Sequence, residues 1–185
     1  MIKTKADLKE YIEADESRYT KRKYPILGWL LGDEGYVVKR YLRLLRNLEY
    51  YTNKERHLFD YVPYLYYLIR FRRARIRTGI QLNVNTIGKG LYIPHYAGGI
   101  YANCVKMGNY CIISSGCVLG DKGGVNGGSP TIGDNVEITV GAKVIGKVSV
   151  GDNVIIAPNS VVVKDVPSNT IVSGVPAKII KMRQG

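Results

Sequence analysis

Histidine and cysteine, the side chains best suited to proton transfer near neutral pH, thiol chemistry and zinc binding, are few in this 185-residue chain. The chain has two histidines, His57 and His95, and imidazole is the side chain that exchanges a proton near neutral pH. The three cysteines form no Cys-x-x-Cys pair, and their odd number disfavours a disulfide framework; they are Cys104, Cys111 and Cys117. A structural zinc site is likewise disfavoured, because the chain has too few spaced ligands. We therefore expect no metal.

The two parts of the chain differ in composition, which indicates that His57 and His95 lie on different kinds of secondary structure. Residues 1–80 hold 18 Lys/Arg and 10 Asp/Glu, whereas residues 81–185 hold 9 and 5, which together give the net charge of +12. Of 21 glycines, 17 follow residue 80, while 11 of 15 tyrosines precede residue 81. We therefore predict a helical N-terminal region over 1–78 and a second domain over 79–185.

The second region is a repeat with a period of six. Aliphatic residues recur in phase at Ile132, Ile138, Val144, Val150, Ile156 and Val162. The same step appears upstream at Tyr101, Met107, Ile113 and Leu119. A period of six fits neither a helix nor an alternating strand, but it is typical of a parallel β-helix with one short strand per hexad. We expect the repeated residue to point into the coil, with Gly and Asn/Asp at the corners.

Two interruptions break this rhythm. Two extra residues fall around 95–98, and a thirteen-residue step carries the Gly-rich segment 121–129. A solenoid accommodates insertions as loops, and such loops often form a binding face. His95, the one histidine in this region, adjoins the first insertion.

The N-terminal region shows helical spacing. Thr4 and Asp7 form a capping-box pattern that opens a helix to about residue 20, and amphipathic segments follow over 37–51 and 58–77. The last ends in five arginines within residues 70–77, which favour either a solvated helix end or an anionic partner such as CoA, a lipid phosphate or an acidic glycan. No nucleic-acid-binding motif accompanies the charge, so nucleic acid is not expected. Without a long apolar run or a signal sequence, we expect a soluble cytoplasmic protein.

The hexads, the segment Ile87–His95 and the ending from Ser160 to Lys178, which contains Gly174-Val-Pro-Ala-Lys178, resemble the serine acetyltransferase branch of the hexapeptide-repeat acyltransferases. The resemblance covers about residues 79–181. The helical N-terminus is more similar to the shorter acetyltransferases of polysaccharide biosynthesis. The resemblance implies a mainly β fold, a left-handed parallel β-helix of hexapeptide repeats with an α-helical N-terminal region. It also implies a homotrimer that binds acetyl-CoA in a groove between neighbouring β-helices.

The resemblance assigns His95 as a general base, a role worth about 10²–10⁴ in rate. The position of the aspartate that orients this histidine in the family is occupied here by Gln81. The orienting partner is therefore an amide, a backbone carbonyl or Asp121, and the candidate amides are Gln81, Asn83, Asn85 and Asn103. His57 is expected to be a surface or packing residue.

The cofactor residues are also carried over from the resemblance. They are Gly120, Gly123, Val140, Gly141, Ala142, Ala157, Lys164 and Lys178. The glycines would admit the thioester, the segment 140–142 and Ala157 would line the pantetheine arm, and the lysines would meet CoA phosphates as point charges.

Three positions depart from the serine-specific pattern. Pro94 replaces an aspartate, and Gly128 and Ser129 replace an Arg-His pair. These groups would hold the ammonium and carboxylate of serine, and their loss removes charge-assisted contacts. A sugar hydroxyl of a polysaccharide precursor is therefore the expected acceptor. Serine is the alternative acceptor, and a non-catalytic scaffold is the third interpretation.

Overall fold

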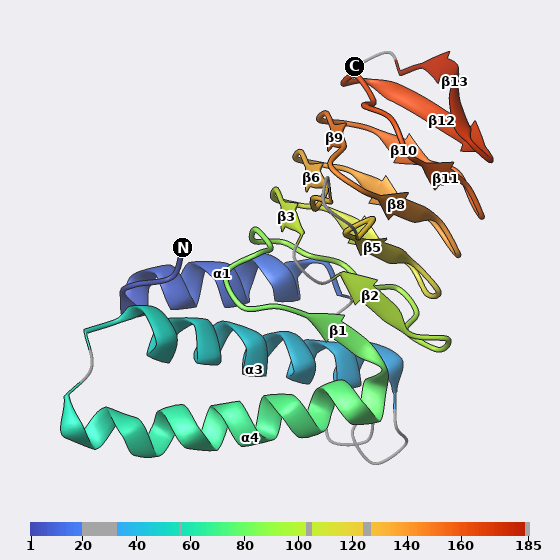
Figure 1. Cartoon of the computed structure of the whole chain (residues 1–185). Coiled ribbons are helices and arrows are strands. Elements are labelled where there is room, and N and C mark those ends of the chain that lie inside the picture. Colours follow the sequence, from blue (N-terminus) through green and yellow to red (C-terminus); the bar gives the residue numbers. More distant parts are fainter. Residues whose placement is uncertain (20–32, 56, 103–104, 124–126, 184–185) are drawn as a thin grey trace.

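The computed structural model describes residues 1–19, 33–55, 57–102, 105–123 and 127–183. A layer of helices lies at one end of a stack of β coils, and the C-terminus lies at the opposite end (Figure 1). The helices are α1 (Lys5–Ser17), α3 (Glu34–Asn53), the 3₁₀ turn η1 (Leu58–Asp60) and α4 (Tyr61–Thr78).

Side-chain caps set where these helices begin. The Thr4 hydroxyl accepts a hydrogen bond from the Asp7 backbone N–H, and the Asp7 carboxylate accepts one from the Thr4 N–H, so the predicted capping box is confirmed. The Asp33 side chain accepts from the Tyr36 N–H and starts α3 earlier than the amphipathic pattern indicated. Gly79 ends α4 with a left-handed backbone (φ 70°), which glycine adopts without steric cost.

Thirteen short strands follow in the described part of residues 80–183. They are β1 (Ile80–Leu82), β2 (Ile100–Ala102), β3 (Lys106–Met107), β4 (Ile112–Ile113), β5 (Val118–Gly120), β6 (Thr131–Ile132), β7 (Glu137–Ile138), β8 (Lys143–Ile145), β9 (Ser149–Val150), β10 (Ile155–Ile156), β11 (Val161–Val162), β12 (Thr170–Gly174) and β13 (Ala177–Met182). They form three sheets, ordered β1-β2-β5-β8-β11, β3-β6-β9 and β13-β12-β10-β7-β4. All pairings are parallel except β12 with β13. From β2 to β12, successive strands therefore lie on different sheets, as in a parallel β-helix.

The register places one residue of each hexad above its equivalent in the next coil. On the first sheet the buried column is Leu82, Ala102, Leu119, Val144 and Val162. The predicted hexad position Tyr101 is wrong by one residue, because its side chain is 52% exposed while Ala102 is fully buried. The preceding insertion shifts the phase, and a small residue fills the column at this coil. Two corners, Asn135 and Asn153, have the left-handed backbone (φ 56°) expected for Asn at a turn.

Helix α3 is joined to the first coil by a buried ion network. Arg46 is fully buried and donates to the carboxylates of Asp15 (2.8 Å) and Glu49 (3.0 Å) and to the carbonyls of Ile87 (2.9 Å) and Gly88 (2.6 Å). Burial raises the pKa of Glu49, and the Arg46 charge opposes that rise. These bonds fix the helical layer to the end of the coil stack.

The helices and the coils share one apolar core, which includes Val38, Leu45 and Phe71 from the helices and Ile80 from β1. The Tyr41 hydroxyl donates to the Ile80 carbonyl (3.0 Å) inside this core. The division into domains over 1–78 and 79–185 stays a prediction. In the part of the chain that the structure describes, no helix is long and apolar enough to cross a bilayer.

The thiols of Cys111 and Cys117 are buried inside the coil, and burial raises the pKa of each to about 11. At pH 8 both are neutral thiols shielded from reagents, and the thiolate is the reactive form. In a Cys104→Ser background we expect no labelling by a thiol reagent at pH 8 in buffer and complete labelling in denaturant. Fast labelling of the native protein would contradict the buried placement.

Candidate active site

His95 lies in the loop between the first coil and β2, and 70% of its side chain is exposed. Its Nδ1 is 2.7 Å from Oε2 of Glu34, the first residue of α3. The two residues are 61 positions apart in sequence. The site is therefore formed where the start of a helix meets the first inserted loop.

Buried anchors hold both sides of this contact. On the loop side, Ile93 is buried in the coil and its backbone N–H donates to the Tyr19 hydroxyl (3.0 Å). Burial raises the pKa of Tyr19, so this hydroxyl stays neutral. On the helix side, the Asp33 cap and the buried Val38 fix the first turn of α3. Buried residues and hydrogen bonds therefore hold the backbone on both sides of the exposed His95–Glu34 pair.

The geometry selects one form of the neutral imidazole. When Nδ1 carries the proton and donates to the Glu34 carboxylate, Nε2 presents its lone pair to solvent as a proton acceptor. A carboxylate on the far nitrogen also stabilises the imidazolium that forms after proton uptake. The pair is therefore arranged for general base work on a ligand that approaches the exposed Nε2.

Three of the sequence-derived candidates for the orienting partner form their contacts elsewhere; they are Gln81, Asn85 and Asp121. Gln81 accepts from Arg75 Nε (2.9 Å) and donates to the Arg75 carbonyl, so its amide is engaged away from His95. The Asn85 side chain pairs with Asn53, and the Asp121 carboxylate closes its own loop by accepting from two backbone N–H groups. Asn103 lies outside the described residues.

The sequence did not identify Glu34 as a partner of His95, because Glu34 lies in the helical region and outside the repeat and its loops. The available signal was the pair Asp33-Glu34 at the start of the amphipathic segment, a cap followed by an acid in the first helical turn. Nothing in the sequence placed that turn beside residue 95. His57, the other histidine, is exposed next to η1, and its backbone N–H donates to Asp60.

The residues predicted to hold CoA lie on adjacent coils further along the stack. Val140 is half-exposed and Ala142 is buried, and the Val140 carbonyl accepts from the N–H of Asn159, two residues after Ala157. Lys164 and Lys178 are exposed. Their contact with CoA stays a prediction. Among the residues that the structure describes, no cluster of His, Cys, Asp and Glu is arranged to hold a metal ion.

The predicted glycines fall into two kinds. A Cβ added at Gly141 (φ +70°) would lie 2.2 Å from the Asn159 side-chain oxygen, so packing within the coil requires this glycine. A Cβ added at Gly120 would meet nothing within 4 Å, and its backbone is not in the left-handed region. Packing within the described chain does not explain the glycine at 120, whereas a ligand against the backbone would.

This contrast gives a matched pair of variants. We expect Gly120→Ala to keep the wild-type melting temperature and to raise KM for acetyl-CoA several-fold, because the new methyl group occupies ligand space. We expect Gly141→Ala to lower the melting temperature by several degrees, since backbone strain costs about 1 kcal/mol or more. Calorimetry and steady-state kinetics measure both. A stable Gly120→Ala variant with unchanged KM would remove residue 120 from the ligand site.

Comparison with known protein families identifies the repeat. The family described as bacterial transferase hexapeptide (six repeats) matches residues 129–164. Serine acetyltransferase of Synechococcus elongatus is 38% identical over 109 residues, which are 58% of this chain and 45% of that protein. Serine acetyltransferase of Staphylococcus aureus is 41% identical over 110 residues, which are 58% of this chain and 52% of that protein. The chain spans about half the length of these relatives.

The similarity in structure covers more of the chain. The crystal structure of Neisseria gonorrhoeae serine acetyltransferase has a TM-score of 0.69 at 25% identity, over 98% of this chain and 70% of that one. The chain is therefore similar in sequence and in fold to serine acetyltransferases, and its residues 129–164 match the bacterial transferase hexapeptide repeat. The predicted left-handed parallel β-helix with a helical N-terminal region is confirmed. The same enzyme in complex with serine has a TM-score of 0.65 at 25% identity, over 96% of this chain and 70% of that chain.

Proposed function

We propose that this chain is an acetyl-CoA-dependent O-acetyltransferase. The observation that carries the proposal is the contact between His95 Nδ1 and the Glu34 carboxylate, which leaves Nε2 without a hydrogen bond to any residue that the structure describes. A neutral alcohol is a weak nucleophile, and a positioned imidazole that removes its proton supplies the activation. The similarity to enzymes named serine acetyltransferase supports acetyl-CoA as the donor.

The proposed reaction balances without a metal or redox partner. Nε2 of His95 takes the hydroxyl proton while the hydroxyl oxygen bonds to the thioester carbonyl carbon. When the tetrahedral intermediate collapses, the C–S bond breaks and the imidazolium returns the proton to the CoA thiolate. The products are an acetyl ester and CoA. Glu34 remains a carboxylate throughout and acts as a positioning residue.

Serine is the acceptor that the comparisons favour. The curated relatives above are named serine acetyltransferases, and the Neisseria enzyme was solved in complex with serine. This support outweighs the expectation of a polysaccharide acceptor, because the relatives reported above are all named serine acetyltransferases. We therefore take formation of O-acetylserine as the first reaction to assay.

A sugar hydroxyl is the second candidate, because this chain has Pro94, Gly128 and Ser129 where charged groups would hold the ends of serine. The deciding experiment measures CoA release by the purified chain with serine, with free sugars and with nucleotide sugars. Saturation by serine in the millimolar range or below would establish the first candidate. Turnover with a sugar and none with serine would establish the second, and no CoA release with any acceptor would leave the scaffold interpretation.

We place acetyl-CoA in a groove between neighbouring β-helices of a homotrimer, against the face that carries Val140, Gly141 and Ala157. Light scattering tests the trimer, and titration with CoA tests the site.

The cytoplasmic location stays a prediction. So does contact of the basic helices with a membrane surface, for which α4 offers the exposed apolar residues Leu65 and Ile69. Sedimentation with anionic vesicles tests that contact.

A further inference from the structure

A cavity of about 580 Å³ opens between α3 and α4. Its walls include Tyr36, Arg40, Arg70, Arg73, Arg77 and Tyr96. Its volume lies within the range of small-molecule sites, about 300–1,000 Å³. It is separate from the coil face predicted to bind CoA, because α3, α4 and the loop residue Tyr96 line it.

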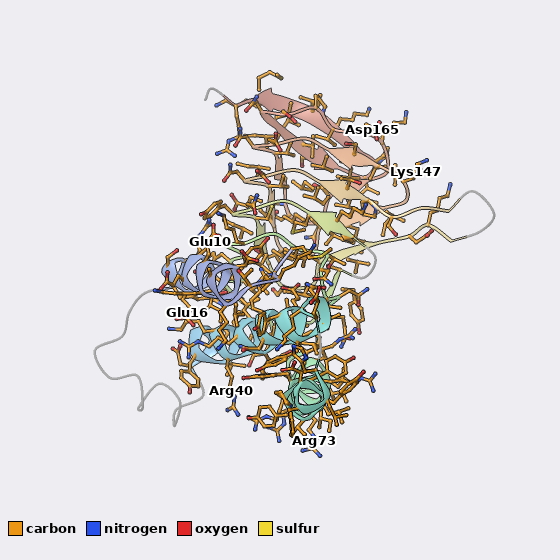
Figure 2. All side chains as sticks on the ribbon, turned by 90° about the vertical axis from the view of Figure 1, so that its left-hand side faces the viewer. Glu10, Glu16, Arg40, Arg73, Lys147 and Asp165 are labelled. Atoms are coloured by element: carbon orange, nitrogen blue, oxygen red, sulfur yellow. The ribbon has the colours of Figure 1, made fainter. Side chains whose placement is uncertain are left out.

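The charged side chains among the described residues that line the cavity are all positive. Its described lining residues include four arginines and no acidic side chain. The side chains of Arg40, Arg73 and Arg77 form no hydrogen bond or ion pair to another residue in the described ranges, and the Arg70 guanidinium donates to the Tyr66 hydroxyl (3.3 Å). Arg40 and Arg73 lie on the side of the helical layer away from the β coils (Figure 2).

Three other arginines on the same two helices are paired. Arg43 pairs with the Glu16 carboxylate, Arg46 is held by its buried network, and Arg75 bonds to Gln81. The arginines that lack a partner carboxylate thus include those that converge on the cavity. Like charges held close together raise the electrostatic energy of the free protein, and a bound anion relieves it. Guanidinium forks suit phosphate, which they bind with two parallel hydrogen bonds.

The cavity adjoins the candidate base through shared segments. Tyr36 stands two residues after Glu34 on α3, and Tyr96 directly follows His95. Adjacent Cα atoms are about 3.8 Å apart, so the cavity opens beside the loop that presents the imidazole. A ligand anchored in it by a phosphate could extend a hydroxyl towards His95.

We propose that this cavity binds the diphosphate of a phosphorylated sugar acceptor, whose hydroxyl then reaches His95. The assignment rests on the proposed O-acetyltransferase function and on its second acceptor class. The arginines hold the diphosphate, and the rings of Tyr36 and Tyr96 offer apolar faces to the sugar. None of these residues takes part in proton transfer, so they determine acceptor affinity.

Binding is tested first, without turnover. The purified full-length chain is titrated with inorganic pyrophosphate by calorimetry at low salt. We expect saturable binding that weakens at least about tenfold in Arg73→Gln/Arg77→Gln. The matched control is Arg72→Gln, which removes an exposed arginine of the same helix that does not line the cavity. Its affinity should stay within about twofold of wild type, and unchanged melting temperatures show that the variants fold.

Three results of the titration would overturn the proposal. The first is absence of pyrophosphate binding, and the second is an equal loss in Arg72→Gln, which would indicate a diffuse charge effect. The third is displacement of pyrophosphate by saturating CoA, which would reassign the cavity to the co-substrate. Each result stands whether or not acetyl transfer is detected.

Kinetics then test the acceptor role and its source. With a nucleoside diphosphate sugar and with a prenyl diphosphate sugar, the double variant should raise KM at least tenfold and leave kcat nearly unchanged. With the same sugar lacking phosphate, the variant and wild type should behave alike. The diphosphate acceptor with the lower KM identifies the source. Intact pyrophosphate binding together with no transfer to either acceptor would refute the acceptor role, and loss of transfer to serine as well would refute the proposed function.

Discussion

Replacing His95 by alanine is expected to lower kcat for acetyl transfer by about 10²–10⁴, the loss typical of a removed general base. KM for acetyl-CoA should change little, because the imidazole acts on the acceptor hydroxyl. Stopped assays of CoA release with the acceptor identified above measure both quantities. His57→Ala is the matched control, since His57 is exposed next to η1 and should be replaceable without loss. A loss below about tenfold in His95→Ala would contradict the base assignment.

Glu34→Gln tests the positioning role separately. The amide keeps the size of the side chain but removes the charge that favours the productive tautomer and the imidazolium. We expect kcat to fall up to about 100-fold with KM for acetyl-CoA unchanged, since misplacing a catalytic group costs rate before it costs binding. Glu34→Asp should recover part of the loss. An equal kcat in Glu34→Gln and in wild type would show that Glu34 does not position His95 during turnover.

Arg46→Ala is expected to destabilise the fold by roughly 3–5 kcal/mol, the cost of breaking a buried ion pair. The Asp15 and Glu49 carboxylates and the carbonyls of Ile87 and Gly88 would lose their shared donor away from water. For a chain of this size that free energy corresponds to a fall in melting temperature of roughly 6–20 °C. Scanning calorimetry or chemical denaturation measures it.

Arg43→Ala supplies the control on the same helix. Its pair with Glu16 is largely exposed, with 61% of the Arg43 side chain accessible, and such pairs contribute about 0–1 kcal/mol. We expect its melting temperature to stay within a few degrees of wild type. Similar losses in both variants would show that the buried network does not join α3 to the coil.

The repeat could be predicted from residue types alone because every coil has the same packing and turn requirements. Every sixth residue must fill the interior, and every corner needs a backbone that Gly or Asn adopts readily. Ile132 to Val162 satisfy that rule without interruption, so both fold class and inward positions followed. The rule failed at Tyr101, where the insertion before β2 advances the phase by one residue and Ala102 takes the buried position.

The candidate base was also apparent from the sequence, since His95 adjoins an insertion and no other histidine lies in the repeat. Its partner was not, because a contact between residues 61 positions apart depends on how the helical layer packs against the first coil. The buried network of Arg46 and the core around Tyr41 set that packing, and they act through contacts distant in sequence. Local spacing therefore determined the coil and its histidine, while tertiary packing brought Glu34 to His95 and gathered the arginines around one cavity.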